Sequence, residues 1–215
     1  MRYTSILFDL DGTLLDTLAD LTAAMNRTLT RHGLPERTRQ QMRTALGNGA
    51  RRLTELSVPA GTDSALFETL LAEYNADYAA HCRIETAPYP GVAALLLKLH
   101  AQGRKLAIVS NKPDEAVRAL RAEFFADTVP IAVGEKQGIR RKPAPDTLLT
   151  AMAQLGAERE STVYVGDSEV DIATARAAGL PCISVLWGFR DRDVLEQAGA
   201  QHFAADADEL ARLLD

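Results

Sequence analysis

Two acidic residues, Asp9 and Asp11, follow a short apolar run near the start of the chain. Because they are two positions apart, their side chains share one side of an extended backbone, and Gly12 permits a sharp turn that leaves both accessible. Two neighbouring carboxylates repel each other, and a divalent cation relieves that repulsion while both stay ionised. The alternative is an exposed Asp-Gly turn without chemistry. We favour paired acids that act with a cation.

A second group of acids, Asp167 and Asp171, lies far along the chain, directly after the apolar run 162–165. In open α/β sheets ligands bind at the carboxyl ends of the strands, so these acids can meet Asp9 and Asp11 there. The alternative roles are helix capping for Asp167 and a favourable helix-dipole position for Asp171. An all-oxygen ligand set suits Mg²⁺ better than zinc. We therefore predict a Mg²⁺ site formed by Asp9, Asp11, Asp167 and Asp171.

A hydroxyl, an amide and a lysine occupy two further loops. Ser110 and Asn111 directly follow the apolar run 105–109, and Lys142 precedes a helix-like segment. A carboxylate nucleophile, a cation, a hydroxyl donor and an ammonium are the parts needed to hold a phosphoryl group during in-line transfer. Taken alone, Ser110 would be assigned as a helix cap and Lys142 as a solvated loop residue. The ordered set favours a phosphoryl-transfer site.

Alternating strands and helices are expected to position these residues. Apolar runs cover residues 4–9, 105–109, 162–165 and 182–186, and helical patterns cover residues 92–102, 114–125, 146–155 and 169–178. Continuous apolar runs are typical of strands buried on both faces, and their alternation with helices indicates crossover connections. The predicted fold class is α/β, a doubly wound, mainly parallel, Rossmann-like sheet formed by residues 1–15 and 86–215.

One region breaks this alternation and is predicted to form a separate all-helical cap domain, residues 16–85. Helix-like stretches cover residues 18–31, 37–46 and 63–81, with no convincing strand between them. The residues Pro88, Pro90 and Gly91 then mark the return to the main domain, because they favour extended or turned backbone. An insertion at this point is expected to move as a lid.

Composition excludes several classes of protein. With 47% apolar and 25% charged residues the chain is an ordinary globular sequence, and its net charge of −5 without basic clusters argues against nucleic acid as a partner. No apolar stretch approaches the roughly 20 residues that cross a bilayer, and no leader-like segment opens the chain, so we expect no membrane partner and a cytoplasmic location. The two cysteines, Cys82 and Cys182, form no metal-binding pattern and are predicted to be free thiols.

Together these residues resemble the motifs of the haloacid dehalogenase superfamily. Asp9-Leu10-Asp11-Gly12-Thr13 resembles its first motif, Ser110 its second, Lys142 its third and residues 166–171 its fourth, in that order along the chain. The resemblance spans essentially the whole chain, including a helical cap inserted after the first motif. It therefore implies the same α/β core and a phosphoryl-transfer activity.

The resemblance also implies individual roles. Asp9 would attack phosphorus and form an aspartyl-phosphate, while Asp11 would protonate the leaving oxygen and then activate water. The cofactor Mg²⁺ would be bound by Asp9, the main-chain carbonyl of Asp11 and Asp167, with Asp171 nearby. The phosphoryl group would be held by Thr13, Ser110, Asn111 and Lys142.

Asp11 distinguishes branches of this superfamily. The dehalogenases and phosphonate-cleaving members lack an acid at this place, and a phosphate-ester leaving group needs its proton. The segments 47–51 and 187–189 resemble the phosphoglycolate phosphatases, so we expect a phosphatase acting on a small phosphorylated metabolite, as monomer or homodimer, with 2-phosphoglycolate as the leading substrate. The alternatives are a β-phosphoglucomutase-like phosphomutase, against which the absence of histidine from residues 16–31 weighs, a pyrophosphatase or nucleotidase, and a non-catalytic binding protein.

The cap offers a candidate substrate contact at Asn48, Gly49 and Arg51. Backbone amides of a Gly-rich turn leading into a helix bind anions, and an arginine can meet a carboxylate with two hydrogen bonds. The alternative is a loop between cap helices with solvated arginines. The sequence supports both interpretations equally.

Overall fold

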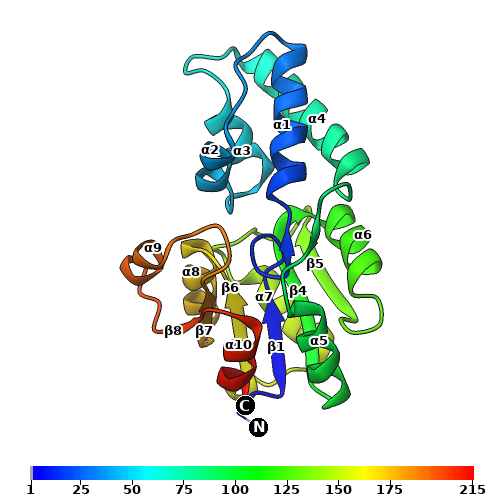
Figure 1. The fold of residues 1–215 in the computed structure, drawn as a ribbon, viewed down its shortest axis with the longest axis vertical. Coiled ribbons are helices and arrows are strands. Elements are labelled where there is room, and N and C mark those ends of the chain that lie inside the picture. The colour runs from blue at the N-terminus through cyan, green and yellow to red at the C-terminus, as the bar shows by residue number, and fades with distance from the viewer. Residues whose placement is uncertain (1) are drawn as a thin grey trace. The chain divides into compact units, whose positions relative to one another are not determined.

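The computed structural model describes residues 2–215, which fold into two compact units. One unit holds the chain up to Leu15 together with Pro88–Asp215, and the other holds Asp16–Ala87. The two-residue strands β2 (Leu15–Asp16) and β3 (Ala87–Pro88) contain the two points where the chain passes from one unit to the other, and they pair with each other. Figure 1 labels the helices of both units and the strands of the first unit. No helix of residues 2–215 has both the length and the apolar character to span a membrane.

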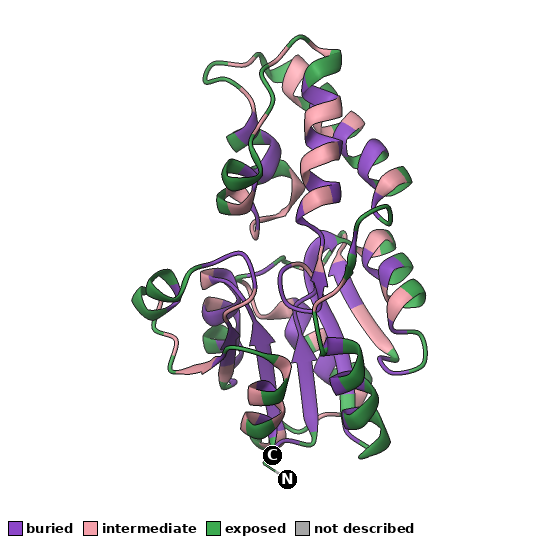
Figure 2. Ribbon diagram, in the orientation of Figure 1, coloured by how far each residue is buried: buried purple, intermediate pink, exposed green. Residues whose placement is uncertain are grey.

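The first unit is built on a six-stranded sheet whose paired strands all run parallel, in the order β5-β4-β1-β6-β7-β8. Its strands are β1 (Ser5–Phe8), β4 (Lys105–Pro113), β5 (Ile131–Glu135), β6 (Thr162–Gly166), β7 (Cys182–Val185) and β8 (His202–Ala204). The central strands β1 and β6 are buried along their whole length, as expected inside a parallel α/β sheet (Figure 2). This confirms the predicted fold class.

The strand register brings three chemical segments to one edge of the sheet. Strand β1 lies between β4 and β6, with Phe8 opposite both Ile108 and Val165. The next residue, Asp9, still donates its backbone N–H to the carbonyl of Val165 at 2.9 Å. Because parallel strands end at the same edge, the residues that follow β1 and β6 are neighbours there. Ser110 and Asn111 reach this edge from inside β4, beyond Val109, where the register with β5 shifts; the strand thus runs four residues past the predicted apolar run 105–109.

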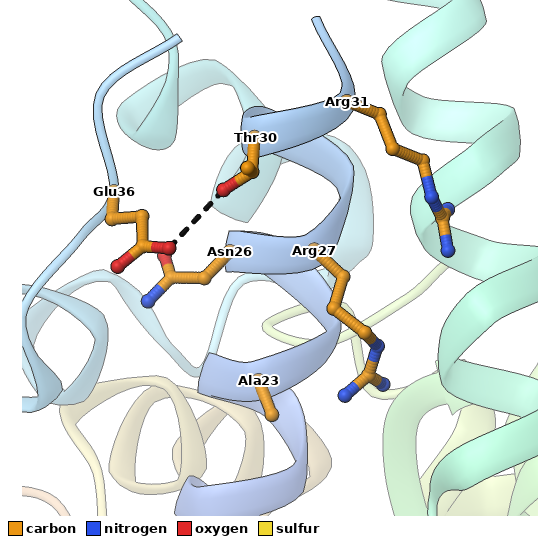
Figure 3. Close-up of a pocket in the computed structure, with 6 residues that line it drawn as sticks. All are labelled: Ala23, Asn26, Arg27, Thr30, Arg31 and Glu36. Carbon is orange, nitrogen blue, oxygen red and sulfur yellow. Dashed lines mark hydrogen bonds between the residues drawn. The ribbon is translucent and has the colours of Figure 1, made fainter. Parts of the chain in front are cut away.

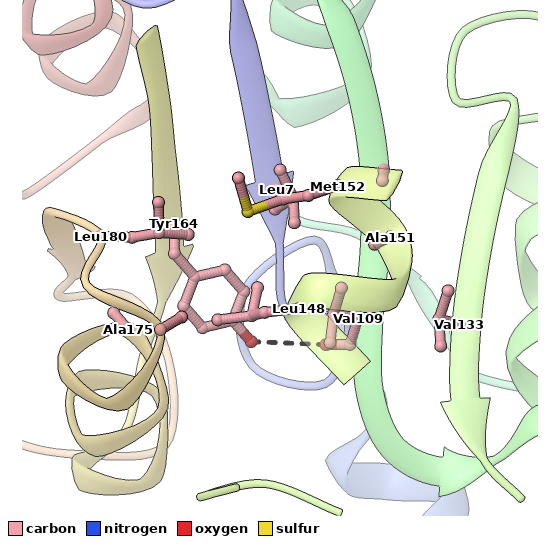
Figure 4. Close-up of a cluster of buried hydrophobic side chains, with 11 residues drawn as sticks. Leu7, Val109, Val133, Leu148, Ala151, Met152, Tyr164, Ala175 and Leu180 are labelled. Carbon is pink, nitrogen blue, oxygen red and sulfur yellow. Dashed lines mark hydrogen bonds between the residues drawn. The ribbon is translucent and has the colours of Figure 1, made fainter. Parts of the chain in front are cut away.

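Helices of the first unit complete its core. They are α5 (Val92–Ala101), α6 (Asp114–Phe124), α7 (Asp146–Leu155), α8 (Glu169–Ala178), α9 (Arg192–Gln197) and α10 (Ala207–Leu214), with the short 3-10 helix η1 (Arg159–Ser161) before β6. Leu148 of α7 packs with Leu7, Val109 and Tyr164 of the sheet in one buried cluster (Figure 4). Burial of each such side chain stabilises the fold by about 1.5–3 kcal/mol, which fixes the strands that carry the site.

The second unit is entirely helical between its two connecting strands. Its helices are α1 (Leu18–Arg31), α2 (Arg39–Ala45), α3 (Gly49–Ser57) and α4 (Ser64–His81). Thr38 and Gln41 form a capping box at the start of α2, and Asp63 caps α4. The buried carboxylate of Asp20 accepts hydrogen bonds from the backbone N–H groups of residues 84–86, which ties the exit of the unit to α1.

Among the elements without a counterpart in the ranges predicted from sequence are β5, β8, α3 and α9. Strand β5 contains Gly134, whose missing side chain leaves room for the backbone of Asp114. Strand β8 and helix α9 are only three and six residues long, so neither shows a full hydrophobic period. The longer strands and helices could be predicted because each is long enough to show its pattern of apolar residues.

Candidate active site

Asp9 lies at the centre of a charged cluster at the carboxyl edge of the sheet. Its Oδ1 atom accepts a hydrogen bond from the backbone N–H of Leu10 at 2.7 Å and lies 2.9 Å from Nζ of Lys142. Asp9 is 7% exposed and Lys142 3% exposed, so water screens this ion pair little. The structure therefore brings together the residues predicted as nucleophile and phosphoryl-binding cation.

Asp9 is one of three buried carboxylates that lie close together here. Asp9, Asp167 and Asp171 each offer one oxygen, and these oxygens lie within 4.8 Å of one another. Together with the ammonium of Lys142 they leave a formal excess of two negative charges, which a divalent cation would neutralise. An all-oxygen, acidic donor set of this kind fits Mg²⁺.

Both oxygens of Asp171 are already engaged by the protein. Oδ1 lies 2.7 Å from Nζ of Lys142 and accepts from the hydroxyl of Tyr164 at 2.9 Å. Oδ2 accepts from the Ser168 hydroxyl at 2.6 Å, within a capping box at the start of α8. Asp171 thus organises Lys142 and the loop after β6, which leaves Asp9 and Asp167 as the more available cation ligands.

Asp167 is held by two other loops. Its Oδ2 accepts the backbone N–H of Phe189 at 2.7 Å, and its Oδ1 accepts the hydroxyl of Thr13 at 3.3 Å. Gly12, at φ +82°, and Gly188 both pack so closely on Asp167 that a Cβ at either position would overlap its side chain. Small residues at both positions therefore let three loops close around one carboxylate.

The electrostatics of this cluster favour a bound cation. Burial, and then the charge of Asp171, raises the pKa of Asp9 well above its usual value, although Lys142 opposes the shift. Burial and Asp171 also raise the pKa of Asp167 to about 7. Burial alone would raise the pKa of Asp171, but Lys142, together with hydrogen bonds from Ser168 and Tyr164, outweighs burial and lowers that pKa. A dication beside Asp9 and Asp167 would return both to the ionised form.

The remaining core residues of the prediction lie at the same sheet edge with other partners. The Asp11 carboxylate pairs with Nζ of Lys112 at 3.1 Å. Ser110 is 2% exposed, and its hydroxyl accepts the backbone N–H of Lys112 at 3.2 Å. The Asn111 carboxamide makes two hydrogen bonds, of 3.0 and 2.8 Å, with the main chain of Lys142. Asn111 thereby anchors the loop that carries Lys142.

The candidate residues of the cap form contacts within their own unit. Asn48 is the residue before α3, and Gly49, at φ +79°, begins that helix. The Arg51 guanidinium pairs with both carboxylate oxygens of Glu68, at 2.7 and 2.9 Å, and lies over the ring of Phe67. Since the side chains of Arg51 and Glu68 are 54% and 55% exposed, water reaches this ion pair.

Helix α1 carries an open pocket of about 520 Å³, lined by Ala23, Asn26, Arg27, Thr30, Arg31 and Glu36 (Figure 3). Figure 3 shows Arg27 and Arg31 directed toward α4, where both pair with Asp77. On the other side of α1 the Thr30 hydroxyl donates to Glu36 at 3.1 Å. Arg27 and Arg31 thus join α1 to α4, and Thr30 joins α1 to the loop before α2, which gives the pocket walls a structural role.

Sequence reasoning missed three residues of the site: Lys112, Tyr164 and Phe189. A phenol between two buried valines of the strand 162–165 was the signal for Tyr164, and a lysine directly after Ser110 and Asn111 was the signal for Lys112. Phe189 contributes its backbone N–H, which side-chain chemistry cannot reveal. Its only signal was the Trp-Gly-Phe segment at residues 187–189.

The parallel sheet and its buried acid cluster define an α/β protein with a candidate site for phosphoryl transfer. Comparison with known proteins gives the family. Residues 6–185 match the haloacid dehalogenase-like hydrolase family, and the chain belongs to it. The phosphoglycolate phosphatase of Xanthomonas campestris pv. campestris is 36% identical over 192 residues, which cover 88% of this chain and 86% of that protein.

Two further relatives extend the comparison. The N-acetylmuramic acid 6-phosphate phosphatase of Pseudomonas aeruginosa is 31% identical over 207 residues, covering 96% of this chain and 90% of that protein. The crystal structure of a candidate phosphoglycolate phosphatase from Lactobacillus delbrueckii subsp. bulgaricus matches with a TM-score of 0.94 and 37% identity, over 100% of this chain and 99% of that one. Relatives named phosphatases, on a common fold, assign this chain to the phosphatases of the family.

Proposed function

We propose that the chain is a Mg²⁺-dependent phosphomonoesterase that acts on a small phosphorylated metabolite through an aspartyl-phosphate on Asp9, with 2-phosphoglycolate as the leading substrate. One observation carries this proposal. The Asp9 carboxylate lies between the Lys142 ammonium, at 2.9 Å, and two further buried acids, Asp167 and Asp171. A nucleophilic carboxylate with a neighbouring cation and a divalent-metal donor set is the arrangement that phosphoryl transfer requires.

In the first half-reaction a carboxylate oxygen of Asp9 attacks phosphorus, and the bond to the ester oxygen breaks. The leaving oxygen takes a proton from the carboxyl group of Asp11. In the second half-reaction the Asp11 carboxylate takes a proton from water, and the water oxygen attacks phosphorus and releases Asp9 with inorganic phosphate. Ser110 and Thr13 are proposed to hold phosphoryl oxygens during both steps.

The metal ion would be held by Asp9, Asp167 and the main-chain carbonyl of Asp11, and when bound it would supply positive charge to the phosphoryl oxygens. Lys142 supplies the second positive charge from its fixed place beside Asp9. Asp171 holds that lysine through a 2.7 Å ion pair, so it supports binding of the phosphoryl group indirectly.

The substrate preference is proposed to reside in the cap, residues 16–85, because the groups around Asp9 recognise only the phosphoryl group. The two relatives are named for phosphoglycolate and N-acetylmuramic acid 6-phosphate, both of which carry a carboxylate. Asn48, Gly49 and Arg51 are the proposed cap contacts for that group, as an anion-binding turn followed by an arginine. A cytoplasmic location and a monomeric or homodimeric state complete the proposal.

A phosphate-release panel tests this function. It should compare 2-phosphoglycolate, N-acetylmuramic acid 6-phosphate, pyrophosphate, nucleotides and sugar phosphates, each with Mg²⁺ and with excess chelator. We expect release that requires the metal and is fastest with a carboxylate-bearing monoester. Hydrolysis that persists in chelator would refute the metal role, and a neutral sugar phosphate as best substrate would refute the substrate class.

A phosphomutase remains the second candidate, because every residue around Asp9 would be the same in such an enzyme. The two activities differ in what accepts the phosphoryl group: water in a phosphatase and a sugar hydroxyl in a mutase. Isomerisation of β-glucose 1-phosphate that is faster than phosphate release would favour the mutase.

A further inference from the structure

Tyr164 brings a phenol hydroxyl to the charged cluster from inside the hydrophobic core. The residue is wholly buried on β6, and its ring packs with Leu7, Val109 and Leu148 (Figure 4). Packing alone requires no hydroxyl here, and a buried hydroxyl without partners destabilises a fold. The partners of this hydroxyl therefore indicate what it does.

The hydroxyl of Tyr164 bridges two charged side chains. It accepts a hydrogen bond from Nζ of Lys142 at 3.0 Å and donates to Oδ1 of Asp171 at 2.9 Å. The carbonyl of Val109, at 3.4 Å, is a longer alternative acceptor for the same proton. With its single proton directed to Asp171, the oxygen presents a lone pair to Lys142.

This contact completes the hydrogen bonding of the Lys142 ammonium. An ammonium has three N–H donors. Nζ has three acceptors within hydrogen-bond distance, namely Oδ1 of Asp9 at 2.9 Å, Oδ1 of Asp171 at 2.7 Å and the hydroxyl of Tyr164 at 3.0 Å. Because Lys142 is only 3% exposed, the direction of every N–H is set by protein groups.

Tyr164 is the one uncharged acceptor of the three, which gives it a distinct effect. The carboxylates of Asp9 and Asp171 both orient and neutralise the ammonium, whereas a hydroxyl orients it and leaves its positive charge available. When Asp9 bonds to phosphorus it loses its negative charge, so the N–H that faced Asp9 can turn to a phosphoryl oxygen.

We infer that Tyr164 is a positioning residue, which fixes the Lys142 ammonium toward the phosphoryl group being transferred. This inference rests on the proposed phosphatase function. Tyr164→Phe removes the hydroxyl and keeps the buried ring, so the fold should persist. Loss of one hydrogen bond to a charged group should lower kcat for p-nitrophenyl phosphate about tenfold.

Calorimetric titration with orthovanadate gives a readout that is independent of turnover. In the presence of Mg²⁺, Tyr164→Phe should weaken vanadate binding about tenfold while the apparent affinity for Mg²⁺ changes less than about twofold. The matched control is Tyr3→Phe, the same chemical change at a buried tyrosine before the amino end of β1. The control should match the wild type in both measurements.

The Lys142→Met background distinguishes an effect of Tyr164 on Lys142 from an effect on packing. If Tyr164 acts through Lys142, Tyr164→Phe should weaken vanadate binding no further once Lys142→Met is present. The same tenfold loss in that background, unchanged vanadate binding in the single variant, or an equal loss of Mg²⁺ affinity would each overturn the inference. A wild type that neither hydrolyses p-nitrophenyl phosphate nor binds vanadate would overturn the proposed function, and this inference with it.

Discussion

The ammonium of Lys112 lies 3.1 Å from the carboxylate of Asp11, and the lysine side chain is 5% exposed. A lysine this buried is stable as a charged group only when it is paired. The pair therefore holds the Asp11 carboxylate in one orientation at the edge of the sheet. Since Asp11 is the proposed proton donor, Lys112 should matter most where the leaving group needs a proton.

Lys112→Met tests this relationship with a series of leaving groups. For alkyl phosphates we expect kcat/KM to fall about tenfold or more, and for p-nitrophenyl phosphate less than about threefold, because a good leaving group departs without a proton. Asp11→Asn is the matched control and should give the same trend, more steeply. An equal loss across all leaving groups would instead assign Lys112 to phosphate binding.

Asp9→Asn should abolish turnover and preserve the fold. The amide cannot attack phosphorus, so we expect a loss of at least about a thousandfold in kcat. Because burial and the charge of Asp171 raise the pKa of Asp9, removal of its carboxylate also relieves repulsion. Thermal unfolding without Mg²⁺ should therefore show equal or higher stability. Substantial residual phosphatase activity, in protein free of wild-type contamination, would reject Asp9 as nucleophile.

Binding of Mg²⁺ should depend on pH through Asp167. Burial and Asp171 raise its pKa to about 7, so below that pH a cation must displace a proton. The Mg²⁺ affinity should then fall by up to about tenfold per pH unit below 7. Calorimetric titration at about pH 6 and about pH 8 measures this, with Asp167→Asn as the control that lacks the proton. Equal affinities at the two pH values would contradict the prediction.

The same shift has a stability consequence whose sign can be worked out. The pKa of an unfolded aspartate is near 4, whereas burial and Asp171 raise the pKa of Asp167 in the folded protein to about 7. The folded state therefore binds the proton more tightly, and the metal-free protein should lose stability as pH rises from about 4 to about 7. Added Mg²⁺ should restore stability above that range, which thermal unfolding with and without the metal can measure.

The residues of the site that follow apolar runs could be predicted from the sequence. The residues that join the site through the conformation of a long side chain could not. Asp9, Ser110 and Asp167 each follow a buried apolar run, and the ends of parallel strands coincide. Tyr164 makes a hydrogen bond and Lys112 an ion pair whose directions depend on rotamer and packing, which no periodicity encodes. The same limit applies to the cap, where the Glu68 partner of Arg51 lies on another helix.

Asp77 should stabilise the cap through its two arginine partners, Arg27 and Arg31. Burial alone would raise its pKa, but hydrogen bonds and charges from Arg27 and Arg31 outweigh burial and lower it. We expect Asp77→Asn to destabilise the cap by about 1–2 kcal/mol, less than for fully buried pairs because the arginines are 36% and 52% exposed. Urea unfolding followed by circular dichroism measures the change.

Acid should remove this contribution. A lowered pKa gives stability that is present above the unfolded pKa, near 4, and is lost as pH falls through the folded pKa. Asp77→Asn and the wild type should therefore converge in stability at low pH. Glu68→Gln, on the same helix but exposed, is the control and should unfold like the wild type. A constant difference at all pH values would show that Asp77 acts through packing.

A substitution of Arg51 tests whether the cap binds a substrate carboxylate. Arg51→Ala should raise KM for 2-phosphoglycolate about tenfold and leave p-nitrophenyl phosphate within about twofold, because only the first offers a carboxylate to the guanidinium. Steady-state kinetics on both substrates provide the comparison. Equal losses on the two substrates would reject the contact.

A substitution of Glu68 makes this test more specific, because the Glu68 carboxylate pairs with the Arg51 guanidinium at 2.7 and 2.9 Å. Exposed ion pairs are weak, so a substrate carboxylate can displace Glu68 at little cost. If Arg51 has that role, Glu68→Gln should leave KM for p-nitrophenyl phosphate unchanged and lower KM for 2-phosphoglycolate. The gain should vanish in the Arg51→Ala background, since the two substitutions act on the same guanidinium. A gain that persists there would mean that Glu68 acts on the substrate without Arg51.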